Sequence, residues 1–368
     1  MCGPQRPFRV LRPASRVERF VIGVRLVEGM GMVRAKLVAI MVTARLLSVL
    51  VAPSFGADAG GKPEKPDVIV SYAQPSGAFT PIWVAYEAGL FKKYGLNATL
   101  QLLTPQVSAQ AVVSEEVDFY TDGPDLINAR LRGGQVKYFG GTMQQLVFEI
   151  WAAKEFKTIQ ELKGKTVAAS TPRAALDTAT REALKKNGLA PDKDVQILYV
   201  QTVPAILSAI IGGKTAAGTL SAPNTLKAKE SGLNLLVDIG KLNIPAFQVA
   251  YGTTEKYLRN QPNNVYAFLK AIAEGVALSR KDSVVAKKAI AKYAKIEDGP
   301  TIDGTYEAFA PYWAMSLDVR PEAIKGQFEY LDEKEFPNAK NADPRDFYDN
   351  TFVMALSKSG FLKNLGMR

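Results

Sequence analysis

Short runs of apolar and β-branched residues alternate with stretches of helical period along most of the chain. The runs predict a first set of strands at 68–72, 98–103, 117–120, 136–139 and 147–152. Apolar positions spaced three and four apart predict helices between them at 81–93, 107–114 and 124–131. This alternation is typical of an α/β fold with mostly parallel sheets, because βαβ units place successive strands side by side in one direction.

A second set of the same kind follows, and the pattern then becomes almost wholly helical. The second set has predicted strands at 166–169, 195–200, 216–220 and 235–238, with helices at 174–186, 203–211 and 224–230. A returning strand at 247–252 leads into predicted helices at 263–280, 283–295, 305–313, 321–330 and 347–357. We expect this helical C-terminal tail to pack on the first set.

The two sets resemble copies of one unit. The sequence KKYGL at 92–96 and the sequence KKNGL at 185–189 both place lysines in a last helical turn and glycine just beyond it, as helix ends require. A second pair of matching stretches begins at 123 and 222, so the two offsets are 93 and 99 residues. Two similar α/β lobes predict a cleft between them, with ligands bound beyond the carboxyl ends of the strands.

These patterns predict the domain organisation. We expect the first lobe to contain 67–153 and 247–368 and the second lobe to contain 154–246, with hinge crossings near 153–157 and 241–246. The preceding stretch, 1–57, has the features of a leader.

The leader carries the three regions of a secretory signal. Arg34 and Lys36 precede an apolar stretch at 37–52, and small residues follow at 54–59. The apolar stretch has 16 residues and is interrupted by Arg45, which makes it short for a membrane span. We interpret Met32 as the true start, the alternative being an unusually long basic region. No cysteine follows the stretch, so we expect a periplasmic protein without a lipid anchor.

Composition narrows the possible chemistry. The 368 residues include one cysteine, at position 2, and no histidine, which excludes a Cys/His zinc site, a disulfide and any nucleophile activated by histidine. An enzyme built on Asp, Glu, Lys or a cofactor stays open. The net charge of +10 falls mostly on the leader, which holds nine basic and two acidic residues, so the remaining chain carries only +3. We therefore expect no nucleic-acid partner, no metal and no cofactor.

Candidate site residues lie where strands end and helices begin. Ser76 and Gly77 follow the first strand, and Ser170, Thr171 and Arg173 occupy the equivalent turn of the second set. Helix starts offer free backbone N–H groups and a partial positive charge, so two of them facing one cleft would bind an anion. The alternatives are that Ser76 only caps its helix and that Arg173 is solvated.

Other turns at the carboxyl ends of strands provide further candidates. The complete set of predicted ligand-binding residues is Gln74, Ser76, Gly77, Phe79, Asp122, Thr142, Ser170, Thr171, Arg173, Ser221 and Asn224. Trp83 and Phe79 could stack on a ligand, although Trp83 fits better as a core residue of its helix. Asp177, one turn into its helix, fits a structural role or a partner of Arg173.

Several of these stretches together resemble a known family. The sequence YAQPSGAFTPIWVA at 72–85, followed by GLFKKYGL at 89–96, is similar to the opening of the nitrate, sulfonate and taurine solute-binding proteins of ABC transporters. The resemblance continues through EVDF, LKGKTVAAS and LSAP at 116–119, 162–170 and 220–223, and it covers about 67–300. It implies a two-lobed type 2 periplasmic-binding fold that closes on a small solute.

The chain departs from the family pattern at two places. It reads STPR at 170–173, where relatives commonly have Ser-x-Pro-Gly, and it lacks the usual acidic residue near 215–217. The first departure bears on the identity of the ligand.

The resemblance implies a solute-binding protein that captures a small solute by hinge closure and delivers it to the transmembrane subunits of an ABC permease. The helix starts and Arg173 favour an anionic organic solute, and we expect a monomer. An enzyme similar to the pyrimidine-precursor synthases is the alternative, but those enzymes depend on histidine. A ligand-sensing protein on the same fold is a third hypothesis.

Overall fold

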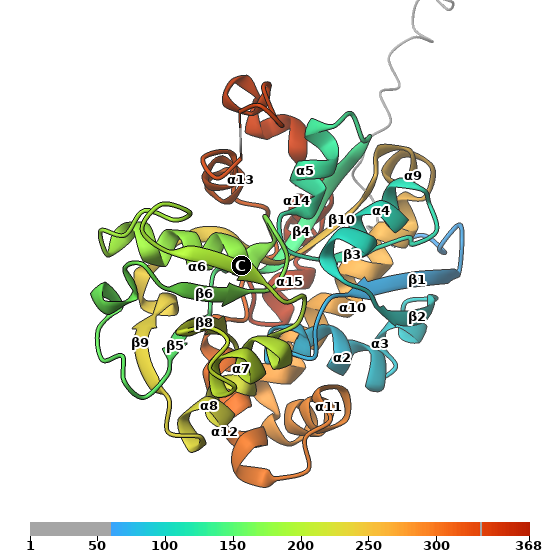
Figure 1. Ribbon diagram of the computed structural model, residues 1–368. Helices are drawn as coiled ribbons and strands as arrows, with labels where there is room; N and C mark the ends of the chain where they lie inside the picture. The colour runs from blue at the N-terminus through green and yellow to red at the C-terminus, as the bar shows by residue number, and fades with distance from the viewer. Residues whose placement is uncertain (1–59, 332) are drawn as a thin grey trace, which may run out of the picture. The chain divides into compact units, whose positions relative to one another are not determined.

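The computed structural model describes residues 60–331 and 333–368 (Figure 1). The predicted leader at 1–57, with the proposed start at Met32, lies outside the described residues. Within the described part of the chain, no helix is long and apolar enough to cross a membrane.

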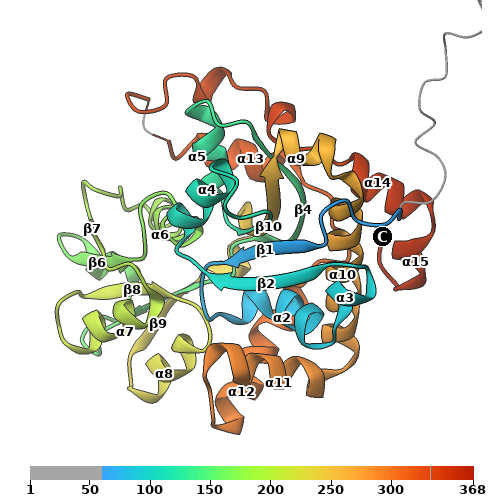
Figure 2. The ribbon, with the colours of Figure 1, turned by 90° about the vertical axis from the view of Figure 1, so that its right-hand side faces the viewer.

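Two sheets built on the first set of strands form the first lobe. Strand β1 (Asp67–Tyr72) pairs in parallel with β2 (Asn97–Leu102), and β10 (Pro245–Thr254) lies between β3 (Tyr120–Asp122) and β4 (Val136–Gln145), antiparallel to both. Figure 2 shows β1 and β2 side by side. The associated helical segments are η1 (Gly77–Phe79), α2 (Thr80–Glu87), α3 (Leu90–Lys93), α4 (Pro105–Val113) and α5 (Asp125–Leu131).

One five-stranded sheet forms the second lobe, in the order β7-β6-β8-β5-β9. Its strands are β5 (Glu149–Ala152), β6 (Thr166–Ala169), β7 (Gln196–Tyr199), β8 (Ala217–Leu220) and β9 (Asn234–Asp238). Its helical segments are η2 (Ile159–Leu162), α6 (Ala175–Lys186), α7 (Val203–Ile211), α8 (Asn224–Glu230) and η3 (Ile239–Leu242). The three strands β7, β6 and β8 are parallel, whereas β5 runs antiparallel to both of its neighbours.

The α/β fold class is confirmed, but the place of β5 differs from the prediction. The apolar run at 147–152 was assigned to the first set, and the structure pairs β5 with β8 and β9 of the second lobe. The first crossing between the sheets therefore lies at 146–148 and not at 153–157. The chain enters the second lobe along β5 and returns from it along β10. Each antiparallel strand pair in the two lobes includes one of these two strands. The boundaries of the lobes as folding units stay a prediction.

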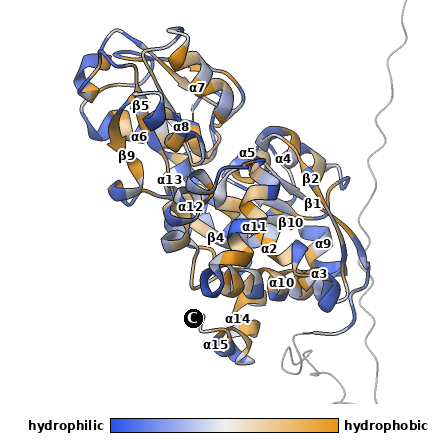
Figure 3. Ribbon diagram, turned by 90° about the horizontal axis from the view of Figure 1, so that it is seen from below, coloured by the Kyte–Doolittle hydropathy of each residue, from blue (hydrophilic) through white to orange (hydrophobic). Residues whose placement is uncertain are grey.

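The remaining chain is helical, as predicted. Its α-helices are α9 (Glu255–Asn260), α10 (Pro262–Lys281), α11 (Ser283–Ala294), α12 (Gly299–Phe309), α13 (Pro321–Phe328), α14 (Thr351–Lys358) and α15 (Phe361–Asn364). The 3-10 segments are η4 (Ala310–Tyr312), η5 (Ala339–Asn341) and η6 (Pro344–Phe347). Figure 3 shows that these helices combine hydrophobic and hydrophilic residues, as expected where one face covers a sheet. Helix α10 approaches α2 closely at Gly275, where a Cβ would lie 2.4 Å from the carbonyl oxygen of Pro81.

Separate apolar cores hold the two lobes. Trp83 is fully buried in the first core and stacks on Tyr293 with 5.2 Å between ring centroids, so its predicted core role is confirmed. A second cluster surrounds β5, β6 and β8 of the second lobe. A third lies beneath α4, α5 and α13 and includes Tyr120, Ile127 and Ile324.

The two matching helix ends have the same geometry. Gly95 and Gly188 have φ of 84° and 78°, in the left-handed region. Each is followed by a leucine whose N–H donates back five residues, from Leu96 to Phe91 at 2.9 Å and from Leu189 to Leu184 at 3.0 Å. This part of the sequence repeat therefore corresponds to the same helix-ending conformation. The first helix is interrupted where the prediction was continuous, because Gly89 adopts φ of 68° between α2 and α3.

Candidate functional site

A small cavity lies where the two lobes meet. The first lobe contributes Gln74, Ser76 and Phe79 after β1 and Asp122 at the end of β3, and the second lobe contributes Ser221 after β8. Its volume is about 20 Å³, which is room for about one water molecule. These five predicted site residues therefore come together from different turns, as expected for groups at the carboxyl ends of strands.

Ser76 has its predicted capping role and also lies on the cavity wall. Its Oγ accepts a hydrogen bond from the N–H of Ala78 at 3.4 Å, so it caps η1, and it also lines the cavity. The adjacent Gly77 has a packing role, because a Cβ there would lie 2.4 Å from the Phe309 ring. The Gly77 carbonyl accepts from Thr80 Oγ1 at 2.8 Å and from Trp313 Nε1 at 3.3 Å, which fixes the start of α2.

Three buried side-chain atoms near the junction have no hydrogen-bond partner among the described residues. They are Asp122 Oδ2 on the first lobe and Ser170 Oγ and Thr171 Oγ1 on the second. Ser170 and Thr171 belong to the turn that contributes Ala174 to the cavity wall. A buried polar atom without a partner costs about 1–3 kcal/mol, so three of them on facing turns indicate a place for a polar ligand.

The surroundings of Asp122 favour its protonated form. Burial raises the pKa of its carboxyl well above the ordinary value, and the neighbouring Asp125 carboxyl raises it further. A protonated carboxyl can donate a hydrogen bond, unlike an ionised one. Asp122, Ser170 and Thr171 can therefore all present O–H donors to a ligand.

Arg173 lies outside the cavity. Its backbone has φ of 64°, which is in the left-handed region that favours glycine. Its guanidinium Nη1 donates to Glu335 Oε2 at 2.8 Å. The side chain therefore pairs with the C-terminal part of the chain instead of pointing into the cavity.

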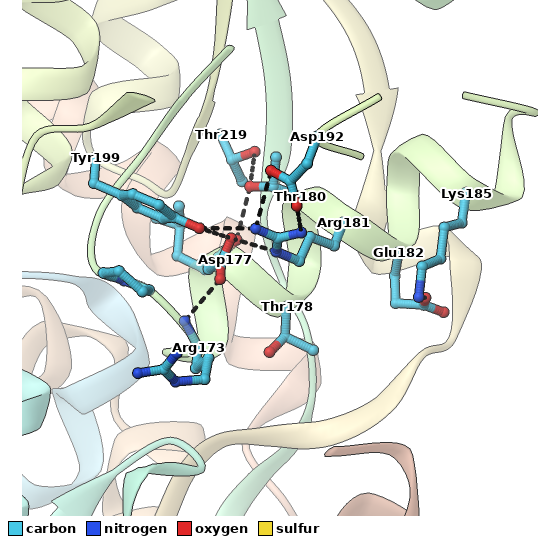
Figure 4. A network of polar contacts seen from close by, with 12 residues as sticks. Arg173, Asp177, Thr178, Thr180, Arg181, Glu182, Lys185, Asp192, Tyr199 and Thr219 are labelled. Carbon is cyan, nitrogen blue, oxygen red and sulfur yellow. Dashed lines mark hydrogen bonds and ion pairs between the residues drawn. The ribbon is translucent and has the colours of Figure 1, made fainter. Parts of the chain in front are cut away.

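Asp177 fixes the turn in this strained conformation. Its Oδ2 accepts the backbone N–H of Arg173 at 2.7 Å, and its Oδ1 accepts from Arg181 Nε at 3.0 Å and from Tyr199 at 3.1 Å (Figure 4). Asp177 is 1% exposed, and burial raises its pKa while Arg181 acts in the opposite direction. It binds the backbone of Arg173, so its role is structural.

Two predicted residues lie in supporting positions. Thr142 Oγ1 is 2.7 Å from the hydroxyl of Tyr251, and this buried pair connects β4 to β10. The backbone N–H of Asn224 donates to the Ser221 carbonyl at 2.9 Å and so shapes the turn after β8. Neither side chain is among those that line the cavity.

Sequence reasoning missed two residues that line the cavity beside the crossings. Phe148 precedes β5, and Gln248 lies on β10. The Gln248 side chain accepts the N–H of Val147 at 2.6 Å and donates to its carbonyl at 3.4 Å, so it joins the two crossings. A crossing assigned to 146–148 would have identified Phe148, but the apolar run there gave no signal of a change of sheet.

The comparisons with known proteins agree with this geometry. The family model described as "NMT1/THI5 like" matches residues 76–283, which is more than half of the chain. The chain belongs to the NMT1/THI5-like family. Among curated proteins, none matches it.

Two of the solved structures similar to this NMT1/THI5-like chain are periplasmic binding proteins. The aliphatic sulphonate binding protein SsuA from Escherichia coli has a TM-score of 0.62 and 19% identity, over 77% of this chain and 92% of that one. The nitrate-binding protein NrtA from Synechocystis PCC 6803 has a TM-score of 0.61 and 14% identity, over 83% and 92%. At such identities the likeness shows the fold alone. The predicted family and two-lobed periplasmic-binding fold are thus confirmed.

Proposed function

We propose that this protein is an extracytoplasmic solute-binding protein of an ABC importer, which captures a small organic anion between its lobes and delivers it to the permease. The observation that carries the proposal is the set of unpartnered donors on both sides of the junction, Asp122 on one lobe and Ser170 and Thr171 on the other. A ligand bonded to all three would hold the lobes together and so couple its capture to closure.

The chemistry of these groups supports an anion. Hydroxyls and a protonated carboxyl offer O–H donors, and donors aimed at one point suit the oxygens of a sulfonate, nitrate or carboxylate. The sequence-based preference for an anion depended on Arg173. Because its guanidinium binds Glu335, Arg173 contributes to closure of the lobes and does not contact the anion. The anion would therefore be bound by neutral donors.

The cavity volume of about 20 Å³ requires the lobes to separate before a solute enters. The two crossings between the lobes permit this separation. Each is a few residues long, and the Gln248 side chain links them by hydrogen bonds. Capture by hinge closure then needs no covalent chemistry, which agrees with the absence of histidine from the chain.

A thermal-shift screen against sulfonates, nitrate and carboxylates tests the proposal. A solute at 100 times its Kd stabilises the protein by about 2.7 kcal/mol, which shifts Tm by a few degrees. The double variant Ser170→Ala, Thr171→Val should weaken binding of that solute at least tenfold, since hydrogen bonds to charged groups contribute about 1.5–3 kcal/mol each.

Ser208→Ala provides the matched control, because that hydroxyl is bonded to the Pro204 carbonyl within α7. The control should bind like the unmodified protein. Recovery of a chemically altered solute would overturn the proposal in favour of an enzyme, and equal binding by both variants would remove the Ser170 turn from the site.

A further inference from the structure

A second and larger hollow lies between α4 and α5, apart from the cavity between the lobes. It has a volume of about 520 Å³, within the range of small-molecule sites. None of its lining residues lines the inter-lobe cavity. A ligand in this groove would be additional to the proposed inter-lobe solute.

Helix α5 presents two unpartnered acceptors to this groove. Asp125 and Asn128 line it and are 4% and 6% exposed, and neither Asp125 Oδ2 nor Asn128 Oδ1 has a hydrogen-bond partner among the described residues. Residues three apart are neighbours on the surface of a helix, so the two side chains lie on the same face of α5. Two buried acceptors side by side fit a ligand group that carries several N–H donors.

Positive charge lies beside these acceptors. Arg132 lines the groove one turn beyond Asn128 at the end of α5, about 6 Å further along the helix axis, and Arg173 lines it from the second lobe. Both guanidinium groups bind the carboxylate of Glu335. Two arginines facing one carboxylate leave a net positive charge, which suits an anionic group placed next to the N–H donors.

The remaining wall is apolar. Ala109 and Val113 of α4 and Ala129 of α5 line the groove between its polar groups. A ligand therefore meets acceptors at one point, cations at another and methyl groups between them.

We propose that the groove between α4 and α5 binds a small zwitterion with an apolar body, an amino acid of the leucine type. Its ammonium group donates to Asp125 and Asn128, its carboxylate meets Arg132 and Arg173 in competition with Glu335, and its side chain packs on Ala109 and Val113.

Calorimetric titration of the full chain with L-leucine tests this site. Leucine should bind, whereas 4-methylpentanoate, which lacks the ammonium group, and isoamylamine, which lacks the carboxylate, should each bind at least tenfold more weakly. Asn128→Leu and Arg132→Met should each lower the affinity for leucine at least fivefold. Glu335→Gln should raise it, because both arginines are then free for the ligand.

Control variants separate this site from the inter-lobe cavity. Asp122→Leu should leave leucine binding unchanged, and Asn128→Leu should leave binding of the inter-lobe solute unchanged. No leucine binding, equal binding of the one-headed analogues, or loss of leucine binding in Asp122→Leu but not in Asn128→Leu would each overturn the proposal. Failure here would not affect the solute site, whose test uses Ser170 and Thr171.

Discussion

At the scale of single residues, position after a strand was a good guide to the site, and side-chain charge was a poor one. Ser76, Asp122 and Ser221 could be chosen because a predicted strand ends shortly before each of them, and the structure places all three on one cavity. Arg173 could not be placed, because its partner Glu335 is 162 residues further along the chain. The left-handed backbone conformation of Arg173 could not be predicted either, because no local sequence pattern indicates a positive φ at an arginine.

We expect Asp122 to make binding of the proposed anion depend on pH. The protonated carboxyl donates to the anion, and a bound anion raises the Asp122 pKa still further, so affinity is full at low pH and falls as pH rises through the raised pKa. Titrations between pH 5 and 9 measure this. Asp122→Asn keeps a donor, and should bind with little pH dependence, whereas Asp122→Leu should lose at least tenfold. Affinity that increases with pH in the unmodified protein would contradict the assigned donor role.

At the scale of elements, helices and strands were predictable from apolar periodicity, but their sheet neighbours were not. The run at 147–152 has the composition of a buried strand and fits either sheet, and only pairing with β8 and β9 decides its place. Likewise the antiparallel β10 could not be recognised as the central strand between β3 and β4. Local sequence determines an element, whereas its partners depend on long-range packing.

The two matching helix ends permit a test of how much a left-handed backbone conformation costs a residue other than glycine. Gly188 has φ of 78°, and no atom lies within 4 Å of the position that a Cβ would occupy, so Gly188→Ala adds strain without a clash. It should lower the free energy of unfolding by about 1–2 kcal/mol, the cost of a left-handed non-glycine residue. Gly299→Ala at the start of α12, equally open but without positive φ, is the control. Urea unfolding compares them, and equal losses would argue against the strain explanation.

At the scale of the whole described chain, the C-terminal segment reaches the second lobe. The side chain of Gln327 on α13 donates to the Arg173 carbonyl at 3.3 Å and accepts from Thr178 at 3.2 Å, while Glu335 holds the Arg173 guanidinium. Helix α13 packs on β10 of the first lobe through Ala323 and Ile324. These contacts join the two lobes directly.

Arg173→Met should therefore weaken the binding of every inter-lobe solute by the same factor. The ion pair is partly exposed, at 28% for Arg173 and 38% for Glu335, so its loss costs about 0.5–1 kcal/mol, or two- to fivefold in affinity through faster release. Stopped-flow release rates measure the effect. Arg345→Met, which removes a pair within one loop, is the control. A loss confined to anionic solutes would mean instead that Arg173 touches the ligand.

The order of strands in the first lobe has a consequence for biosynthesis. Strand β10 lies at the centre of its sheet, yet it is translated after every strand of the second lobe. A growing chain can complete the inserted lobe while β3 and β4 still await the strand between them. The usual sequence of folding, from the first residues onward, is thereby reversed. Until translation passes Thr254, the first lobe therefore lacks the central strand of this sheet.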